Sequence, residues 1–235
     1  MKPFIPHELF EINSNLKFEL RPNCLIIDNF YKNFEEIHEV ISMMPKEVWK
    51  FNENSRNFKD YYDVRPTIFN HHDIRNTYES FFQNVLEHAM KLSLDSSFTH
   101  SINDKLKNSV KLMHREFHFN CFKWINPPLD KKLQMQPHRD SNKLVAIITI
   151  DKINDGGLAL YDCDNEEDFK FNISEAQNVI CDISRFKINR IIPSKANRLC
   201  IVDGNTFHGG YISNHKQYLN DWRMNQVFFI NKKNN

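Results

Sequence analysis

The stretch Lys143-Leu-Val-Ala-Ile-Ile-Thr-Ile-Asp151, followed closely by Gly156-Gly157-Leu-Ala-Leu-Tyr161, decides the fold class. Both runs are short and apolar, and turn residues bound them, as is typical of buried strands. Similar short runs lie on both sides of them, at 112–124, 178–183, 187–193, 198–203 and 223–230. This spacing predicts a mainly β protein, a β-sandwich or a double-sheet barrel, with flanking helices that cover one sheet from outside.

The region before residue 110 is predicted to supply a strand over 25–31 and two helices. The first helix begins at Asn33, a capping residue with Glu36 three positions on, and Pro45 ends it. Its apolar face consists of Phe34, Ile37, Val40, Ile41 and Met44. The second helix covers 73–94, and its buried stripe consists of Ile74, Tyr78, Phe81, Val85, Ala89 and Leu92. Because no repeat or linker divides the chain, we expect one domain, with 1–109 supporting a β core over 110–235.

The composition excludes several classes of protein. The chain has 235 residues and a formal net charge of +1, whereas binding nucleic acid through its phosphates needs a basic excess, so no nucleic-acid partner is expected. No apolar run is long enough to cross a bilayer, and the first residues lack a secretory signal. The five cysteines are scattered and form no Cys-x-x-Cys pair, which favours a reducing cytoplasm over a disulfide framework. They are Cys24, Cys121, Cys163, Cys181 and Cys200.

The segment Gln136-Pro137-His138-Arg139-Asp140 carries the strongest chemical signal. Residues two apart on a strand point to the same side, so His138 and Asp140 can reach one metal ion. An imidazole and a carboxylate form a ligand pair that Fe(II) accepts, and a second histidine completes a facial triad with open positions. The leading third ligand is His208, which follows a predicted strand and a turn and precedes Gly209-Gly210.

Other histidines compete for these roles, because the pattern His-x-acid is short. His71-His72-Asp73 also fits, but Asp73 stands where a helix is predicted to begin and is a better N-cap than a ligand. His114-Arg115-Glu116 lies on a predicted strand but lacks the strand and Gly-Gly pattern that follow Asp140. His215 is the rival of His208, and we prefer His208 because His215 lies in a polar stretch typical of a loop.

Arg223 opens the last apolar strand. A charge at the start of a buried strand is costly unless it meets an anion, and the planar guanidinium suits a carboxylate. The alternative is a structural ion pair with Asp221 or another acid. We interpret Arg198, ten residues before His208, as a structural or secondary contact.

An ordered series of motifs resembles the prolyl-4-hydroxylase-like branch of the 2-oxoglutarate/Fe(II)-dependent oxygenases. In chain order, the motifs are His138-x-Asp140, Gly156-Gly157-Leu-Ala-Leu-Tyr161, Asn197-Arg198-Leu-Cys-Ile-Val-Asp, His208 and Arg223. The likeness covers 110–230. It implies a double-stranded β-helix, a distorted jelly roll. It also implies that His138, Asp140 and His208 hold Fe(II), that Arg223 binds the remote carboxylate of the cosubstrate 2-oxoglutarate, and that O2 is consumed.

The resemblance predicts a hydroxylase that oxidises an unactivated C–H group and releases succinate and CO2. Asp140 stands where halogenating relatives carry Gly or Ala, which favours hydroxylation. Phe229 stands where nucleic-acid dealkylases carry a second arginine, which again disfavours nucleic acid. The interval from His208 to Arg223 is longer than is usual in the branch, so the alternative remains that another basic residue binds the remote carboxylate of 2-oxoglutarate.

Further roles stay open at this stage. Asn120 either assists the cosubstrate or is a polar group satisfied within the sheet, and Phe122, Trp124 and Tyr161 either line the pocket or belong to the core. The substrate is a small molecule or a peptidyl residue, selected by loops over 50–70 and 126–135. Two alternatives remain for the activity: an inactive jelly-roll metal-binding module, or a cupin-type iron dioxygenase that does not use 2-oxoglutarate.

Overall fold

The computed structural model describes residues 7–43, 49–51, 61–66, 72–92, 102, 110–112, 118–124, 133–135, 137–140, 143–164, 180–182 and 186–232. Within these ranges the protein is mainly antiparallel β-sheet with two α-helices, which confirms the predicted fold class. The short helical turns are η1 (His7–Phe10) and η6 (His215–Leu219). None of the described helices is long and apolar enough to span a membrane.

The larger sheet runs in the order β1-β2-β12-β8-β14-β6-β4-β3, and β5 also pairs with β14. Its strands are β1 (Lys17–Arg21), β2 (Cys24–Asp28), β3 (Trp49–Phe51), β4 (Tyr61–Pro66), β5 (Val110–Leu112), β6 (His118–Trp124), β8 (Lys143–Thr149), β12 (Leu199–Asp203) and β14 (Arg223–Lys232). Strands from the N-terminal region therefore extend the sheet of the β core at both edges, since β2 pairs with β12 and β4 pairs with β6.

The smaller sheet has the order β11-β9-β13, and β10 and β7 pair beside it. Its strands are β9 (Gly157–Cys163), β11 (Phe186–Pro193) and β13 (Phe207–Tyr211), with β7 (Leu133–Met135) and β10 (Ile180–Asp182). An isolated antiparallel bridge between His138 and His208 joins the chain that follows β7 to β13. The chain passes from β8 in the larger sheet to β9 and β11 in the smaller one, and then alternates between the two sheets through β12, β13 and β14, which is the winding of a double-stranded jelly roll.

Two apolar layers result from this winding. The inner layer lies between the sheets, where Leu158 and Leu160 of β9 pack with Val145 of β8 and Val227 of β14. The outer layer lies between the larger sheet and the helices, where residues such as Ile148 and Phe228 meet Phe82 of α2 (His72–Leu92). Consecutive residues of β14 therefore face opposite layers: Met224, Gln226 and Phe228 face the helices, while Arg223, Asn225 and Val227 face the space between the sheets.

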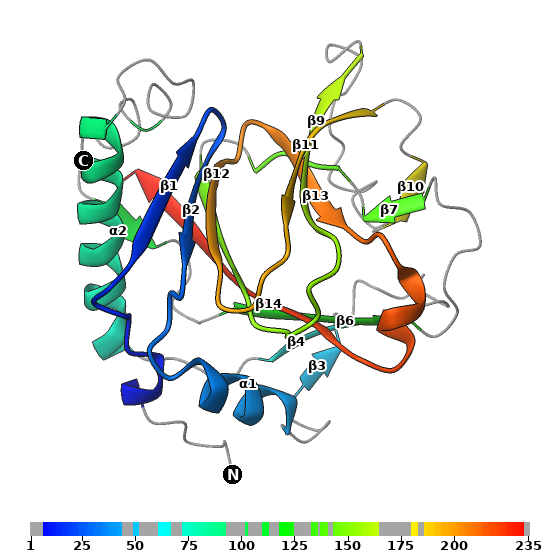
Figure 1. Ribbon diagram of the computed structural model, residues 1–235, viewed down its shortest axis with the longest axis horizontal. Helices are drawn as coiled ribbons and strands as arrows, with labels where there is room; N and C mark the ends of the chain where they lie inside the picture. Colours follow the sequence, from blue (N-terminus) through cyan, green and yellow to red (C-terminus); the bar gives the residue numbers. More distant parts are fainter. Residues whose placement is uncertain are drawn as a thin grey trace.

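The helices cover the outer layer. α1 (Phe34–Ser42) buries Phe34, Ile37 and Ile41, while α2 (His72–Leu92) runs beside β1, on the side of the molecule away from β7 and β10 (Figure 1). Glu79 of α2 is buried and accepts hydrogen bonds from Arg75, Lys111 and the backbone N–H of Leu112. These contacts fix α2 against β5.

Several local predictions were wrong. The Asn33 side chain makes no capping bond to the start of α1; its amide instead donates to the carbonyl of Glu8. Asp73 lies inside the first turn of α2, which begins at His72. On α2, Tyr78, Val85 and Ala89 of the predicted stripe are buried, but Phe82 and Leu86 are buried as well and Leu92 is 56% exposed.

Candidate metal centre

His138 and His208 are placed by a direct backbone pair. The N–H of His138 donates to the carbonyl of His208 at 2.9 Å, and the N–H of His208 donates to the carbonyl of His138 at 3.0 Å. Residues opposite one another in an antiparallel pair share a face, so both imidazoles project to the same side. On β13, His208 pairs with Leu160 of β9, whose side chain faces the inner layer. The two rings therefore lie at the inner face, with centroids 4.6 Å apart.

Asp140 is held in place by the turn after β12. Its N–H donates to the carbonyl of Gly204 at 2.7 Å, and the N–H of Gly204 donates to the carbonyl of Lys143 at 3.0 Å. A Cβ on residue 204 would lie 2.2 Å from the carbonyl oxygen of Asp140, a separation that no side chain tolerates. Glycine at this position thus lets the segment 138–140 approach β12 closely.

The structure brings the three predicted side chains together. The ligand atoms of His138, Asp140 and His208 all lie within 4.8 Å of one another, and this is the one such group of three His, Cys, Asp or Glu residues in the described part of the chain. Asp140 Oδ2 lies 3.3 Å from Nε2 of His208 and 3.7 Å from Nε2 of His138. His208 is 2% exposed and His138 is 41% exposed, so the group is open on the side of His138.

The surroundings prepare these atoms to bind a cation. The Thr206 carbonyl accepts a hydrogen bond from Nδ1 of His208 at 2.8 Å, which assigns the proton to Nδ1 and leaves the Nε2 lone pair directed at the group. Burial alone would raise the pKa of Asp140, but the adjacent His208, His138 and Lys143 more than offset it, and the pKa lies below its usual value. Asp140 is therefore an ionised ligand at neutral pH.

The rival histidines are elsewhere. His72 begins α2, and His215 begins η6 in the segment between β13 and β14. His71 and the segment His114-Arg115-Glu116 lie outside the described residues. As predicted, His208 follows a strand and a turn: β12 ends at Asp203, residues 204–206 form the turn, and β13 begins at Phe207. Gly209-Gly210 continue this strand.

Arg223 lies on the inner face of β14 at the end remote from the triad. Its Nη2 donates to the carbonyl of Gly157 at 3.1 Å. The triad lies near the start of β8. Arg223 lies near the opposite end of β8, two positions before Asn225, which pairs with Thr149. On β9, Gly157 lies three positions before Leu160, the partner of His208, a span of about 10 Å at the usual strand rise.

Asp151 is the carboxylate beside Arg223. It is 2% exposed and accepts hydrogen bonds from the N–H groups of Met224 and Ile153. Burial raises the pKa of Asp151 to about 6, although the charge of Arg223 opposes the shift. The alternative for Arg223, an ion pair with Asp221 or another acid, has no counterpart among the described salt bridges, although the charge of Arg223 acts on Asp151.

Asn225 is a residue that sequence reasoning missed. It is 7% exposed and shares the inner face with Arg223 two positions before it. The spacing of two on a strand was the available signal. Asn120 of β6 lies opposite Asn225 in the register, and Arg223 lies opposite Phe122. The side chains of β6, including Trp124, are outside the described part of the structure.

Two further predicted residues have structural positions. Arg198 donates from Nε and Nη2 to the carboxylate of Asp28 at 2.7 and 3.1 Å, which ties the start of β12 to the end of β2. Tyr161 does not line the space between the sheets. It is 3% exposed and packs with Phe186 and Phe207 on the opposite face of the smaller sheet, because it is one residue from the inward Leu160.

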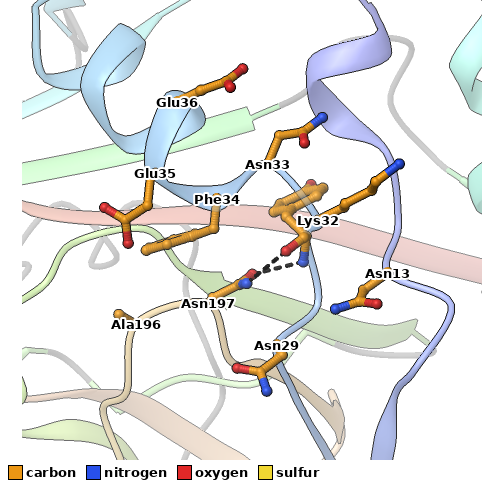
Figure 2. A pocket seen from close by; sticks show the side chains of 10 residues that line it. Asn13, Asn29, Lys32, Asn33, Phe34, Glu35, Glu36, Ala196 and Asn197 are labelled. Atoms are coloured by element: carbon orange, nitrogen blue, oxygen red, sulfur yellow. Dashed lines mark hydrogen bonds between the residues drawn. The ribbon is translucent and has the colours of Figure 1, made fainter.

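A separate cavity of about 500 Å³ lies at the other end of β12, beside the turn before Leu199 (Figure 2). Its lining is mostly polar, with Asn13, Asn29, Lys32, Asn33, Glu35, Glu36 and Asn197 among its residues. The Asn197 amide accepts from the N–H of Tyr31 at 2.7 Å and donates to its carbonyl at 2.8 Å, as the dashed lines show. This side chain therefore joins β12 to the chain before α1, a structural role.

Comparison with known proteins gives only distant likeness. No protein-family model and no curated protein matches the sequence. A 2OG-Fe(II) oxygenase family oxidoreductase from Burkholderia pseudomallei is 9% identical, with a TM-score of 0.43 over 90% of this chain and 85% of that one. HygX from Streptomyces hygroscopicus, solved with nickel and 2-oxoglutarate, is 9% identical (TM-score 0.43, 90% and 84%). A Pseudomonas putida prolyl-4-hydroxylase is 11% identical (TM-score 0.42, 90% and 93%). Similarity this weak carries no functional argument, and the function rests on the chain's own residues.

Proposed function

We propose that this protein is an Fe(II)- and 2-oxoglutarate-dependent dioxygenase that hydroxylates an unactivated C–H group of an amino acid, a peptidyl residue or another small molecule. The observation that carries the proposal is the convergence of His138, Asp140 and His208 on one point at the inner face of a jelly roll. Two imidazoles and one carboxylate, with positions left open, form the ligand set typical of non-haem Fe(II) oxygenases.

The residues present fit such an ion. The Nε2 atoms of both histidines and Oδ2 of Asp140 lie close enough to share one cation, and the Thr206 carbonyl orients the buried imidazole. The lowered pKa of Asp140 keeps its carboxylate charged. When bound, Fe(II) supplies the activation of O2 that couples oxidation of 2-oxoglutarate to succinate and CO2 with hydroxylation of the substrate.

We assign Arg223 to the remote carboxylate of 2-oxoglutarate. It is an inward cation about 10 Å along the strands from the level of His208, a span that suits a small dicarboxylate with one end at the triad. Its bond to the Gly157 carbonyl fixes the guanidinium and leaves other N–H groups to donate to an anion. Asn225 and Asn120, on facing positions of β14 and β6, are candidates to assist it.

The apolar inner layer supports this chemistry. Val145, Leu158, Leu160 and Val227 form a buried apolar cluster on the inner face that His208 also shares. Such apolar surroundings exclude water and strengthen the electrostatic contacts of the triad and of Arg223. The chain's own contribution is therefore binding, orientation and exclusion of solvent, and no side chain of the site is assigned as a general base.

The test is release of succinate. Anaerobically purified protein given Fe(II), 2-oxoglutarate and air should form succinate slowly without substrate, and His138→Ala should abolish it. Arg223→Met should raise the 2-oxoglutarate concentration needed for half-maximal rate by about tenfold or more. Lys17→Gln, an exposed cation on β1, is the matched control and should behave as the wild type. Iron binding without any consumption of 2-oxoglutarate would overturn the proposal in favour of a binding module or a cupin-type dioxygenase.

The compartment remains a prediction. The three cysteines whose side chains are described, Cys24, Cys163 and Cys200, are free thiols, as a cytoplasmic protein would have them.

A further inference from the structure

A β-bulge turns one arginine of the smaller sheet inward. On β11, Ile188 pairs with Tyr161 and Arg190 pairs with Leu160, so Asn189 is an extra residue in this strand. The Asn189 amide donates to both oxygens of the Asp162 carboxylate at 2.9 and 3.0 Å. The insertion reverses the alternation, and Arg190 therefore shares the inner face with Leu160 instead of the outer face with Ile188.

Arg190 lies at the level of the triad. It pairs with Leu160 on β9, and Leu160 pairs with His208 on β13, so the three residues form one inward row across the sheet. Two strand spacings separate the backbones of Arg190 and His208, about 10 Å. The guanidinium is thus within reach of a small molecule whose reacting carbon lies near the triad.

Apolar and thiol side chains share the inner face with Arg190. Its neighbours on the inner face include Ile192 of the same strand and Cys24 and Cys200 of the larger sheet. A hydrogen bond with Cys200 and the positive charge of Arg190 both lower the pKa of the Cys24 thiol, which places the guanidinium near that end of β2. The charge of Arg190 is therefore felt inside the roll.

Within the described ranges, no acidic side chain pairs with Arg190. Its Nη1 is fully buried and has no hydrogen-bond partner among the described residues. The Asp162 carboxylate on the neighbouring strand is bonded by Asn189, and no described salt bridge includes Arg190. A buried donor without an acceptor costs free energy, and a bulge that maintains it is a feature typical of a binding site.

We propose that Arg190 binds a carboxylate of the substrate, so that the proposed hydroxylase acts on a small molecule that carries a carboxylate and presents a C–H group to the triad. This inference rests on the proposed function, which it deepens. The planar guanidinium fork is the donor set that suits a carboxylate. Arg223 is at the remote end of the roll and Arg190 is level with His208, so the two arginines serve different anions, the cosubstrate and the substrate.

The experiment uses the full chain loaded with Zn(II), an ion that keeps the site filled without turnover. The probes are the twenty N-acetyl-L-amino acids and, in parallel, their primary amides, with and without 2-oxoglutarate. Binding is followed as the shift in Tm and confirmed by calorimetry. The variants are Arg190→Gln, Arg190→Lys and the control Lys17→Gln.

We expect at least one acid, and not its amide, to bind the wild type and Lys17→Gln. The Kd of that acid should rise about tenfold or more in Arg190→Gln and by a smaller factor in Arg190→Lys, which keeps the charge but loses the fork. The Kd of 2-oxoglutarate should change less than threefold in both Arg190 variants, which also shows that they are folded.

Three results would overturn the inference: no acid binds the wild type, acids and amides bind equally, or Arg190→Gln weakens 2-oxoglutarate instead of the acid. The last result would mean that Arg190, and not Arg223, binds the remote carboxylate of 2-oxoglutarate. If 2-oxoglutarate fails to bind the wild type, the proposed function fails, while the comparison of acid with amide still reports on Arg190.

Discussion

His138 and His208 exchange both of their backbone hydrogen bonds, at 2.9 and 3.0 Å, although β8 to β12 separate them in the chain. The pairing means that the backbone, and not the bound ion, brings the imidazoles together. Removal of one imidazole therefore leaves the frame intact, and the site can be tested by substitutions that spare the fold.

The first prediction concerns Gly204. In Gly204→Ala, the new Cβ would lie 2.2 Å from the Asp140 carbonyl oxygen and 2.9 Å from that of Lys143, so the segment that carries Asp140 must move away. We expect the free energy of unfolding to fall by about 2 kcal/mol and the Kd for the metal to rise about tenfold. Urea denaturation and metal titration measure the two effects.

The control for Gly204→Ala is Asn205→Ala, at the adjacent exposed position of the same turn. It should leave metal affinity unchanged. Equal metal affinity in Gly204→Ala and the control would contradict the assigned role of this close approach.

The second prediction concerns Asp151. Burial raises its folded-state pKa to about 6, so its ionisation opposes folding, and its contribution to stability is complete below about pH 4 and lost as pH rises through 6. The difference corresponds to about 3 kcal/mol. Asp151→Asn should lose this component, and its free energy of unfolding should change less between pH 4 and 6.5 than that of the wild type. Parallel pH profiles for the two proteins would contradict this pKa.

The third prediction has the opposite sign. The Arg198 guanidinium, assisted by Lys195, lowers the pKa of Asp28 to about 2. The ionised carboxylate stabilises the fold above about pH 4, and this contribution is lost as pH falls toward 2. Because the pair is partly exposed, we expect Asp28→Asn to lower the free energy of unfolding by only about 1 kcal/mol at pH 7. The difference from the wild type should vanish near pH 2, and a constant difference at all pH values would exclude the ion pair as its cause.

Much of the architecture could be predicted from apolar runs alone. The stretch 143–151 forms β8 and the stretch 198–203 forms β12, because buried strands leave continuous apolar sequence. β1 could not be found this way, since its edge position leaves most of its residues exposed and polar. β13 was hidden by Gly209-Gly210, which indicates a turn in sequence but lies within a paired strand.

Only part of the site could be predicted from the sequence. The two-residue spacing of His138 and Asp140 predicts that both side chains point to the same side, and the strand positions of His208 and Arg223 could be predicted as well. Arg190 could not be found, because regular alternation groups it with Ile188, which faces outward, and only the pairing with β9 reveals the bulge. The buried face of α2 was only partly predicted for a related reason: Tyr78, Val85 and Ala89 are buried as expected, but the packing of Phe82 against Phe228 selects among several apolar positions that the helical period allows.

Whether His138, Asp140 and His208 bind one Fe(II) ion is measured by calorimetric titration of Fe(II) into anaerobic protein. The variants are His138→Ala, Asp140→Asn and His208→Ala, with the wild type and the rival-site control His215→Ala. We expect one ion per chain in the wild type and in His215→Ala, and a Kd raised about a hundredfold or more in each of the other three. Unchanged Fe(II) affinity in those three variants, or loss of binding only in His215→Ala, would contradict this expectation.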